Sequence, residues 1–124
     1  MLTLDTSALI RFFTNDIPAD AKKVKLLLNS EEKINIPDVV FPELEYVLLG
    51  QTYNSSRDKV FVAFQFLASK KNIYISTAVK QAIYLYQQSN LDIADCIILA
   101  SATKLMSFDK KLLKLAKNIQ TPTL

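Results

Sequence analysis

Short extended segments alternate with single or paired helical segments along this chain of 124 residues, and no other feature constrains its fold as strongly. The extended segments are short apolar or alternating runs at positions 2–4, 33–37, 72–75, 105–108 and 118–121. Apolar residues at helical spacing predict helices between them, at positions 6–13, 21–29, 38–49, 55–69, 77–88, 90–102 and 110–117. Strands that alternate with helices in this way predict an α/β fold with a parallel sheet.

Residues with short polar side chains stand where most of these helices are expected to begin. Such residues cap helices because their oxygen atoms accept hydrogen bonds from backbone N–H groups that have no partner in the first turn. The caps predicted from their positions are Thr6 or Ser7, Asp38, Ser55, Ser76 and Asp109.

The residue types that the chain lacks exclude several kinds of active site. It has no histidine, one cysteine and one glycine. It therefore contains no Ser-His-Asp triad, no HExxH zinc site and no Gly-rich phosphate-binding loop. Carboxylates that hold a hard cation remain as the leading option for catalysis.

Length and hydropathy predict one domain, residues 1–124, with no membrane anchor. A chain of 124 residues has the usual size of a single domain. No apolar run approaches the roughly 18 residues that indicate a membrane span. The N-terminal segment lacks the pattern of a secretory signal because Asp5 and Arg11 interrupt it. Since the lone Cys96 cannot form an internal disulfide, we expect a cytoplasmic protein.

Acidic residues stand where two predicted strands end. Asp5 follows residues 2–4, and Asp109 follows residues 105–108. In parallel sheets, ligands bind beyond the carboxyl ends of the strands. Each aspartate is also in the right place for a simple helix cap, so each one alone is compatible with a purely structural role.

A second acidic pair lies on one predicted helix. Asp92 and Asp95 are separated by a spacing of i, i+3, which places their Cβ atoms on one face and about 5–6 Å apart. Asp95 also lies three and four residues before Ile98 and Leu99, so it borders an apolar stripe. The alternative is that Asp92 only caps the helix while Asp95 faces the solvent.

Helical spacing does not choose between Glu43 and Glu45 as a further acid, because both border apolar residues of the predicted helix 38–49. Four or five carboxylates that converged on one end of a sheet would repel one another, and a divalent cation offsets such repulsion. Mg²⁺ and Mn²⁺ prefer carboxylate and water oxygens, bind substrate phosphate and lower the pKa of a bound water. The acidic residues are therefore compatible with metal-dependent phosphodiester chemistry.

Four segments, taken in order, resemble the acidic motifs of PIN domains, and most closely those of the VapC-type toxins of bacterial and archaeal toxin–antitoxin pairs. The segments are LDTSALI at 4–10, PEL at 42–44, DIAD at 92–95 and SFDK at 107–110, and the likeness covers essentially the whole chain. The resemblance implies a PIN-like three-layer α/β/α sandwich around a mostly parallel sheet of four to five strands.

The resemblance also implies roles for individual residues. The catalytic acids that it implies are Asp5, Glu43, Asp95 and Asp109, with Glu43 preferred over Glu45. It implies that Mg²⁺ or Mn²⁺ is the cofactor and that Asp5 and Asp95 are its ligands. The supporting residues are Asp92 as a fifth acid and the hydroxyl groups of Thr6 and Ser107.

The activity that the resemblance implies is endonucleolytic cleavage of RNA by metal-activated water, in a toxin that binds a cognate antitoxin protein and forms a homodimer. Two apolar features agree with the presence of such partners. The predicted helix 55–69 carries a second apolar stripe, Val62 and Phe66, besides its main one. Phe12 and Phe13 are adjacent on a helix, so we do not expect both to face the same core.

Lysines on the last predicted helix are candidate RNA contacts. From residue 101 onward five lysines stand against one acid, whereas the whole chain has a net charge of +3. Lys110, Lys111 and Lys114 lie nearest to Asp109 and are predicted to bind RNA phosphates. The alternative is an ordinary solvated face of an amphipathic helix.

Two other functions remain open at this point. The segment between Asp95 and Asp109 is shorter than in the proteins that the chain resembles, which suggests a catalytically weak or inactive PIN-like module that binds RNA or protein. A receiver-like or phosphatase-like α/β domain with a phosphorylated aspartate is a third option, although the order of the acids fits it poorly.

Overall fold

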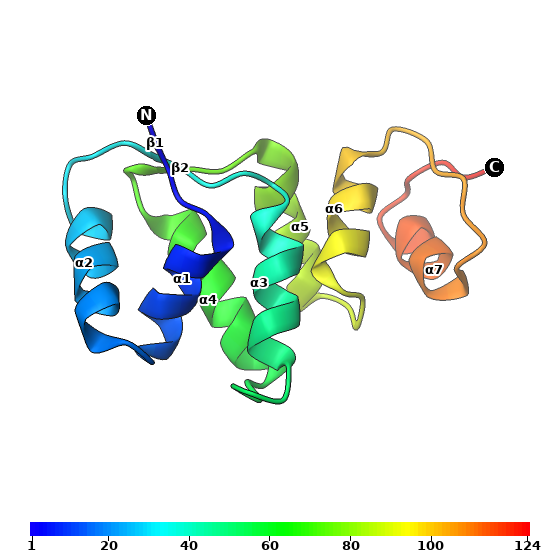
Figure 1. Ribbon diagram of the computed structural model, residues 1–124. Coiled ribbons are helices and arrows are strands. Elements are labelled where there is room, and N and C mark those ends of the chain that lie inside the picture. Colours follow the sequence, from blue (N-terminus) through cyan, green and yellow to red (C-terminus); the bar gives the residue numbers. More distant parts are fainter. The chain divides into compact units, whose positions relative to one another are not determined.

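A computed structural model describes residues 1–124 and divides into two units. We call Met1–Ser76 the N-terminal unit and Thr77–Leu124 the C-terminal unit, and each is described by itself (Figure 1).

The N-terminal unit contains a parallel sheet of three short strands. They are β1 (Leu2–Thr3), β2 (Ile34–Asn35) and β3 (Ile73–Tyr74), in the order β1-β2-β3. Their register sets Leu2 beside Ile34 and Ile34 beside Ile73. The parallel α/β arrangement is confirmed, but the prediction of four to five strands was wrong, because only three of the five predicted segments pair in the sheet.

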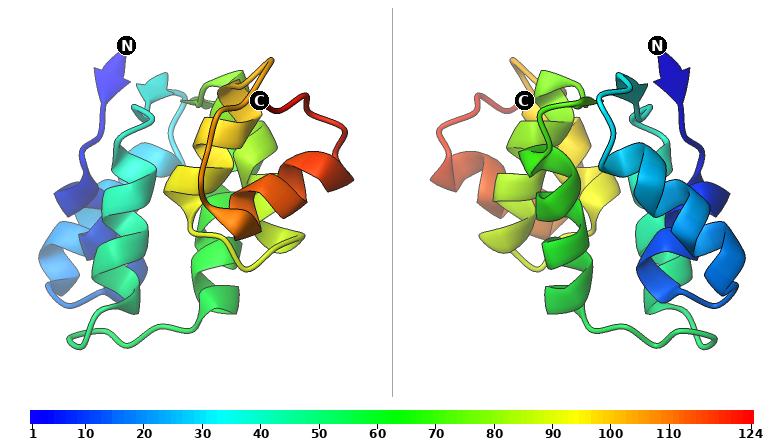
Figure 2. Two further views of the ribbon diagram at one scale, coloured as in Figure 1. Left: turned by 90° about the vertical axis from the view of Figure 1, so that its right-hand side faces the viewer. Right: turned by 90° about the vertical axis from the view of Figure 1, so that its left-hand side faces the viewer.

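Two pairs of helices connect these strands. The first pair, between β1 and β2, is α1 (Thr6–Thr14) and α2 (Pro18–Leu28). The second pair, between β2 and β3, is α3 (Val40–Leu49) and α4 (Arg57–Ser69). Helix α1 packs against α2 and α3, and α3 packs against α4. Figure 2 draws these helices from two sides. The predicted strand–helix–strand alternation is therefore present in this unit.

The caps of these helices differ in part from the prediction. Asp5, and neither Thr6 nor Ser7, caps α1. Asp38 does not cap α3, because only its backbone carbonyl takes part in the turn before the helix, where it accepts a hydrogen bond from Phe41 N. Ser56, one residue after the predicted Ser55, caps α4.

Large apolar side chains make the core of the N-terminal unit. Phe41 and Phe64 are fully buried, and their rings meet edge to face at 5.5 Å between centroids. Ile34 of the central strand and Leu9 of α1 are also fully buried. Each such side chain stabilises the fold by about 1.5–3 kcal/mol, and together they fix the strand ends from which the acidic residues follow.

The C-terminal unit is helical. It consists of α5 (Thr77–Gln87), α6 (Ile93–Ser101) and α7 (Lys110–Asn118); α5 packs against α6, and α6 contacts α7. Cys96 is buried. None of the seven helices of the chain has the length and hydropathy that crossing a lipid bilayer requires.

The two predicted strands of this unit, 105–108 and 118–121, are absent. A single parallel bridge joins Leu105 to Thr123. Leu105 is buried, but Met106 and Phe108 are exposed, so this segment is not covered on both faces as a strand inside a sheet would be. Residues 118–121 instead end helix α7: Gln120 adopts a left-handed φ of 62°, and Thr121 N donates to the carbonyl of Ala116.

Candidate functional site

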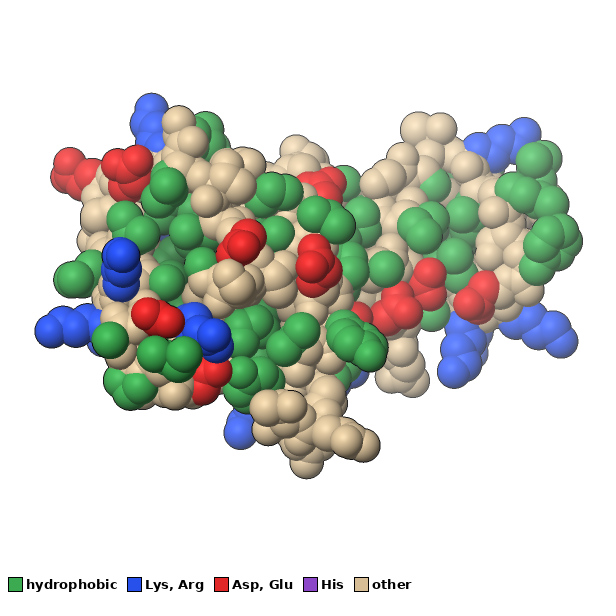
Figure 3. Space-filling view, in the orientation of Figure 1, with side chains coloured by type: hydrophobic (Ala, Val, Ile, Leu, Met, Phe, Trp, Pro, Cys, Tyr) green, Lys and Arg blue, Asp and Glu red, His purple; other side chains and the backbone are tan.

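Asp5 and Glu43, the two predicted catalytic acids of the N-terminal unit, line one cavity. We call it the acidic cavity; its volume is about 550 Å³ and it is open to solvent. Thr6 also lines it, together with residues from the start of α1 and from α3. On the face drawn in Figure 3, acidic side chains are exposed over α1 and α3. The short strand β1 and the first turn of α3 thus deliver two carboxylates to one opening.

The carboxylate of Asp5 is fixed by its role as the cap of α1. Its Oδ1 atom accepts hydrogen bonds from Ser7 Oγ at 2.7 Å and from Ala8 N at 3.1 Å. The hydrogen bond from the Ser7 hydroxyl, followed by that from Ala8, holds the pKa of Asp5 below its ordinary value. Asp5 is therefore ionised at neutral pH. The hydroxyl that binds it belongs to Ser7, whereas Thr6 was the hydroxyl singled out from the sequence.

Burial separates the two glutamates of α3, which helical spacing did not. Glu43 is exposed and lines the acidic cavity. Glu45 is only 7% exposed and does not line it. Of the two, only Glu43 shares an opening with Asp5.

Asp92 and Asp95 meet at the start of α6 in the C-terminal unit. Asp92 caps the helix, and its Oδ1 atom accepts a hydrogen bond of 2.9 Å from Asp95 N. Asp95 itself is half-buried. Burial raises the pKa of Asp95 above its ordinary value, and the negative charges of Asp92 and Asp109 raise it further. The sequence places Asp95 beside apolar residues and on one helix face with Asp92, and the raised pKa is consistent with both.

Asp109 caps α7 in the same unit. Its Oδ1 atom accepts hydrogen bonds from Lys111 N at 2.9 Å and from Leu112 N at 3.2 Å. Ser107 Oγ accepts a hydrogen bond of 3.0 Å from Asp109 N. The serine thus fixes the backbone from which the carboxylate projects. We call Asp92, Asp95 and Asp109 the acidic cluster.

Asp5, Asp92 and Asp109 are therefore helix caps, which is the structural role that the sequence analysis gave as the alternative for each. A helix cap can still bind a metal ion. In Asp5, Asp92 and Asp109, every side-chain hydrogen bond ends on Oδ1 and none on Oδ2. Each cap thus holds its carboxylate in a fixed orientation while the second oxygen stays available.

The donor atoms of these residues suit a hard divalent cation. They are carboxylate oxygens and hydroxyls, the chain has no histidine, and its one cysteine, Cys96, is buried, so the donors suit Mg²⁺ or Mn²⁺ and not zinc. The raised pKa of Asp95 reflects burial and then repulsion from Asp92 and Asp109, and a cation would relieve that repulsion. Within neither unit, however, do three or more such side chains come close enough to hold one metal ion by themselves.

The predicted RNA-binding lysines lie on α7. Lys110, Lys111 and Lys114 are exposed. The ion pairs of Arg11 with Asp16 and Asp20 involve none of these lysines, and no carboxylate neutralises them. Figure 3 shows lysine side chains that extend into solvent beside acidic ones in the C-terminal unit. The positive charge of α7 is available to an anionic ligand.

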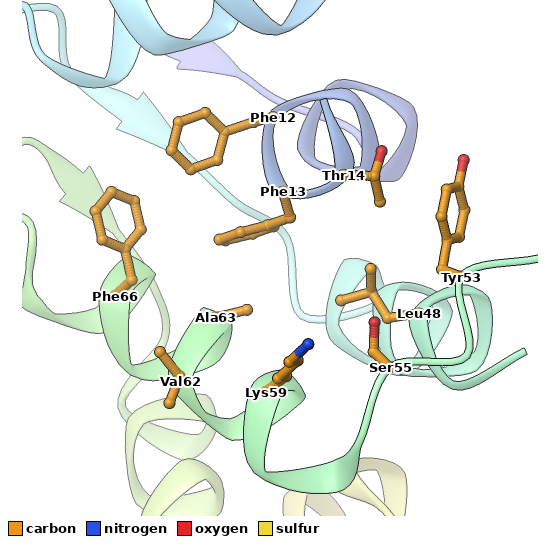
Figure 4. A pocket seen from close by; sticks show the side chains of 10 residues that line it. All are labelled: Phe12, Phe13, Thr14, Leu48, Tyr53, Ser55, Lys59, Val62, Ala63 and Phe66. Atoms are coloured by element: carbon orange, nitrogen blue, oxygen red, sulfur yellow. The ribbon is translucent and has the colours of Figure 1, made fainter. Parts of the chain in front are cut away.

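An aromatic cavity of about 450 Å³ opens between α1 and α4 in the N-terminal unit (Figure 4). The rings of Phe12 and Phe66 stack at 5.5 Å, and Phe13 meets both of them edge to face at 5.0 and 6.1 Å. Phe12 and Phe13 were not expected to face the same core, and neither belongs to the buried core: both are half-buried and pack on Phe66 at the rim of the cavity. Val62, which also lines the cavity, is 62% exposed.

The fold and these acids together define a class of α/β protein that presents carboxylates at strand ends and helix starts. The chain belongs to the PIN domain family, whose model matches residues 2–118, nearly the whole chain and parts of both units. PIN domains are generally nucleases that use divalent metal ions. Comparison with curated proteins and with solved structures gives no match for the chain.

Proposed function

We propose that this PIN domain is an endoribonuclease that depends on Mg²⁺ or Mn²⁺ and hydrolyses RNA phosphodiester bonds. The observation that carries the proposal is the environment of Asp95. Its half-buried carboxylate lies near two further aspartates, and its pKa is raised. Such an arrangement is unfavourable without a cation, and clustered acids with shifted pKa values are typical of functional sites.

Four acids share the work in this proposal. Asp5 and Asp95 hold the metal ion, while Glu43 and Asp109 accept protons from water and orient it. When bound, the divalent ion supplies the positive charge that acidifies water and stabilises the negative charge developing on the phosphoryl group. Ser7 and Ser107 act on the carboxylates: the first hydrogen-bonds to Asp5, and the second holds the backbone of Asp109. Asp92 adds negative charge beside Asp95, and Thr6 lies at the mouth of the acidic cavity.

The exposed lysines of α7 bind the RNA backbone in this proposal. Phosphate contacts position a nucleic acid and contribute a salt-dependent share of its affinity. Lys110, Lys111 and Lys114 follow directly on Asp109 and have no carboxylate partner. They would therefore hold a phosphate backbone next to the acidic cluster.

We also propose that the whole chain is one domain and that it acts in the cytoplasm as the toxin of a toxin–antitoxin pair, as a homodimer. The family match that runs through both units supports a single domain. The resemblance of the acidic motifs to VapC-type toxins supports the role as a toxin, and the open aromatic cavity offers apolar surface to a protein partner. An antitoxin gene adjacent to the gene for this chain would support the pairing.

Cleavage of total RNA by the purified protein tests the nuclease activity. We expect cleavage that needs Mg²⁺ or Mn²⁺ and stops in EDTA, and a loss of at least a hundredfold in Asp5→Asn and in Asp95→Asn. Asparagine is chosen because it caps helices as well as aspartate does. Asp38→Asn is the matched control, since Asp38 is exposed and its side chain caps nothing. Undiminished cleavage by the Asp5→Asn/Asp95→Asn double variant would refute the roles of these acids.

A second candidate function is a PIN-like module that binds RNA or protein without cutting. The short connection from α6 to α7, which holds a single β-bridge, and the lack of a three-ligand group within either unit favour it. Calorimetric titration with Mn²⁺ separates the two candidates. No binding at millimolar Mn²⁺, together with intact RNA binding, would favour the silent module.

A further inference from the structure

A separate cavity in the C-terminal unit combines lysines with side-chain amides. It lies between the loop that joins α5 to α6 and one face of α7, and its volume is about 360 Å³. We call it the lysine–amide cavity, and it is lined by Gln88, Ser89, Asn90, Leu91, Lys111, Lys114, Leu115 and Asn118. A volume of this size lies within the range of small-ligand sites.

The charge of the lysine–amide cavity is positive. Lys111 and Lys114 line it, Lys110 does not, and no acidic residue belongs to the lining. Neither lysine forms an ion pair. Two uncompensated ammonium groups at the mouth of one cavity favour an anion, and phosphate is the anion that lysine pairs commonly bind.

Three amide side chains give the cavity a second chemical character. Gln88, Asn90 and Asn118 are exposed, and their side-chain amide groups make no hydrogen bond in the structure. An amide presents both donors and acceptors, which match the edges of nucleobases. The buried side chains of Leu91 and Leu115 provide an apolar surface against which a planar base can lie. Side-chain amides and an apolar surface are not needed to bind phosphate alone.

The lysine–amide cavity adjoins the acidic cluster along the chain. Leu91 directly precedes Asp92, and the N–H group of Lys111 donates to the carboxylate of Asp109. Residues that line the cavity are therefore next to Asp92 in the sequence and joined to Asp109 by a hydrogen bond.

We infer that the lysine–amide cavity binds one nucleotide of single-stranded RNA, with Lys111 and Lys114 on the phosphate and the amides of Asn90 and Asn118 on the edge of the base. The inference rests on the proposed function, in that RNA is the ligand of the acids beside it. It adds a determinant of sequence preference: the base read here fixes which bond lies next to the acidic cluster.

Fluorescence anisotropy with labelled ten-nucleotide RNAs tests the phosphate contacts. EDTA is present throughout, so no strand is cut during the measurement. We expect Lys111→Gln/Lys114→Gln to weaken binding about tenfold and to lower the salt dependence of log K by about 1.4, which corresponds to two lost phosphate contacts on a single strand. The matched control, Lys104→Gln/Lys117→Gln, removes the same charge from exposed lysines of this unit outside the cavity. An equal loss in both double variants would mean diffuse attraction and would overturn the inference.

The amides are tested by base preference. The wild-type protein is expected to prefer one of oligo(A), oligo(C), oligo(G) and oligo(U) at least fivefold, and Asn90→Ala/Asn118→Ala is expected to reduce that preference to below twofold with an unchanged salt dependence. An unchanged preference in this variant, or none in the wild type, would contradict base reading. Displacement of RNA by millimolar inorganic phosphate with no base preference would show a phosphate site only. All substituted side chains are exposed, and an unchanged thermal midpoint verifies the fold.

These results are distinguishable from a failure of the proposed nuclease. If the wild-type protein cleaves RNA and the variants of the lysine–amide cavity bind RNA as tightly as the wild type, the inference is overturned and the proposed nuclease activity stands. If the wild-type protein binds RNA specifically but never cuts it, and the variants lose that binding, the nucleotide-binding role of the cavity is supported and the nuclease activity is refuted.

Discussion

The folded structure disfavours the ionised form of the Asp95 carboxyl group. Burial, and then the charges of Asp92 and Asp109, raise its pKa above the ordinary value of 3.8. The folded chain therefore holds the Asp95 proton to higher pH than the unfolded chain does. By linkage, the free energy of unfolding decreases as the pH rises from the ordinary pKa through the raised one, and the full loss persists at neutral pH.

Replacing Asp95 by asparagine is therefore expected to stabilise the protein in the absence of divalent metal. Like-charged neighbours on a helix cost a few tenths of a kcal/mol, so we expect Asp95→Asn to raise the free energy of unfolding by that amount at pH 7. The difference should vanish below pH 3.8, where the carboxyl group is protonated in both states. Urea unfolding in EDTA measures it, with Asp38→Asn as the control for net charge. A destabilised Asp95→Asn protein at pH 7 would contradict this account.

The pKa of Asp5 is shifted in the opposite direction to that of Asp95. The hydrogen bonds from Ser7 and Ala8 lower its pKa, so its contribution to stability is fully present above the ordinary pKa and is lost as the pH falls through the lowered one. We expect Asp5→Ala to lower the free energy of unfolding by about 1 kcal/mol at pH 7, and Asp5→Asn to lower it much less, because asparagine still caps α1. Denaturant unfolding at pH 7 and pH 3 provides the measurement. Equal losses in the two variants would mean that the charge, and not the cap, stabilises the helix.

The identity of the site acids was predictable from the sequence only in part. The order of the acidic motifs singled out Asp5, Asp92, Asp95 and Asp109, and the local pattern also gave three of them as possible caps, a role that the structure assigns to them. Helical spacing left Glu43 and Glu45 equivalent, because the burial of Glu45 depends on tertiary packing. Ser7 was missed as a partner of Asp5 because Thr6 or Ser7 itself was predicted to cap the helix. With Asp5 as the cap, the hydroxyl of Ser7 donates a hydrogen bond to it.

At the scale of elements, periodicity predicted the seven helices and three of the strands. It failed where local pattern and tertiary pairing disagree. Residues 105–108 have a short apolar pattern that reads as a strand, yet Phe108 is 89% exposed and only Leu105 finds a partner. Residues 118–121 were assigned to a strand because the sequence does not reveal that Gln120 takes a left-handed φ and ends α7. Such a position usually holds glycine or asparagine.

The end of α7 therefore offers a stability prediction. A left-handed conformation costs a residue with a side chain roughly 1–2 kcal/mol, and glycine gives back part of that gain through its greater freedom in the unfolded chain. We expect Gln120→Gly to raise the free energy of unfolding by roughly 0.5 kcal/mol. Gln65→Gly, at an exposed position inside α4, is the matched control and should lower it by about 1 kcal/mol. Denaturant titration of both variants decides, and a loss of stability in Gln120→Gly would mean that the side chain of Gln120 contributes to the fold.

At the scale of the whole molecule, the proposed catalytic acids are divided between the two units. Asp5 and Glu43 belong to the N-terminal unit, and Asp95 and Asp109 belong to the C-terminal one. Neither unit by itself gathers three metal-ligating side chains. If one metal ion serves all four acids, as we propose, its binding must stabilise both units together, because a ligand stabilises whatever it binds only in the folded state.

Amide hydrogen exchange in the presence of Mg²⁺ tests this coupling. At a Mg²⁺ concentration ten times its Kd, we expect exchange through local opening to slow by about tenfold in the first turns of both α1 and α6, which follow Asp5 and Asp92. Asp95→Asn is expected to abolish the protection in α1 as well as in α6, although α1 belongs to the other unit. KCl at equal ionic strength is the control, because screening alone would act on both proteins alike. Protection of α1 that survives Asp95→Asn, or protection confined to α6, would show that the acids of the two units do not share one ion.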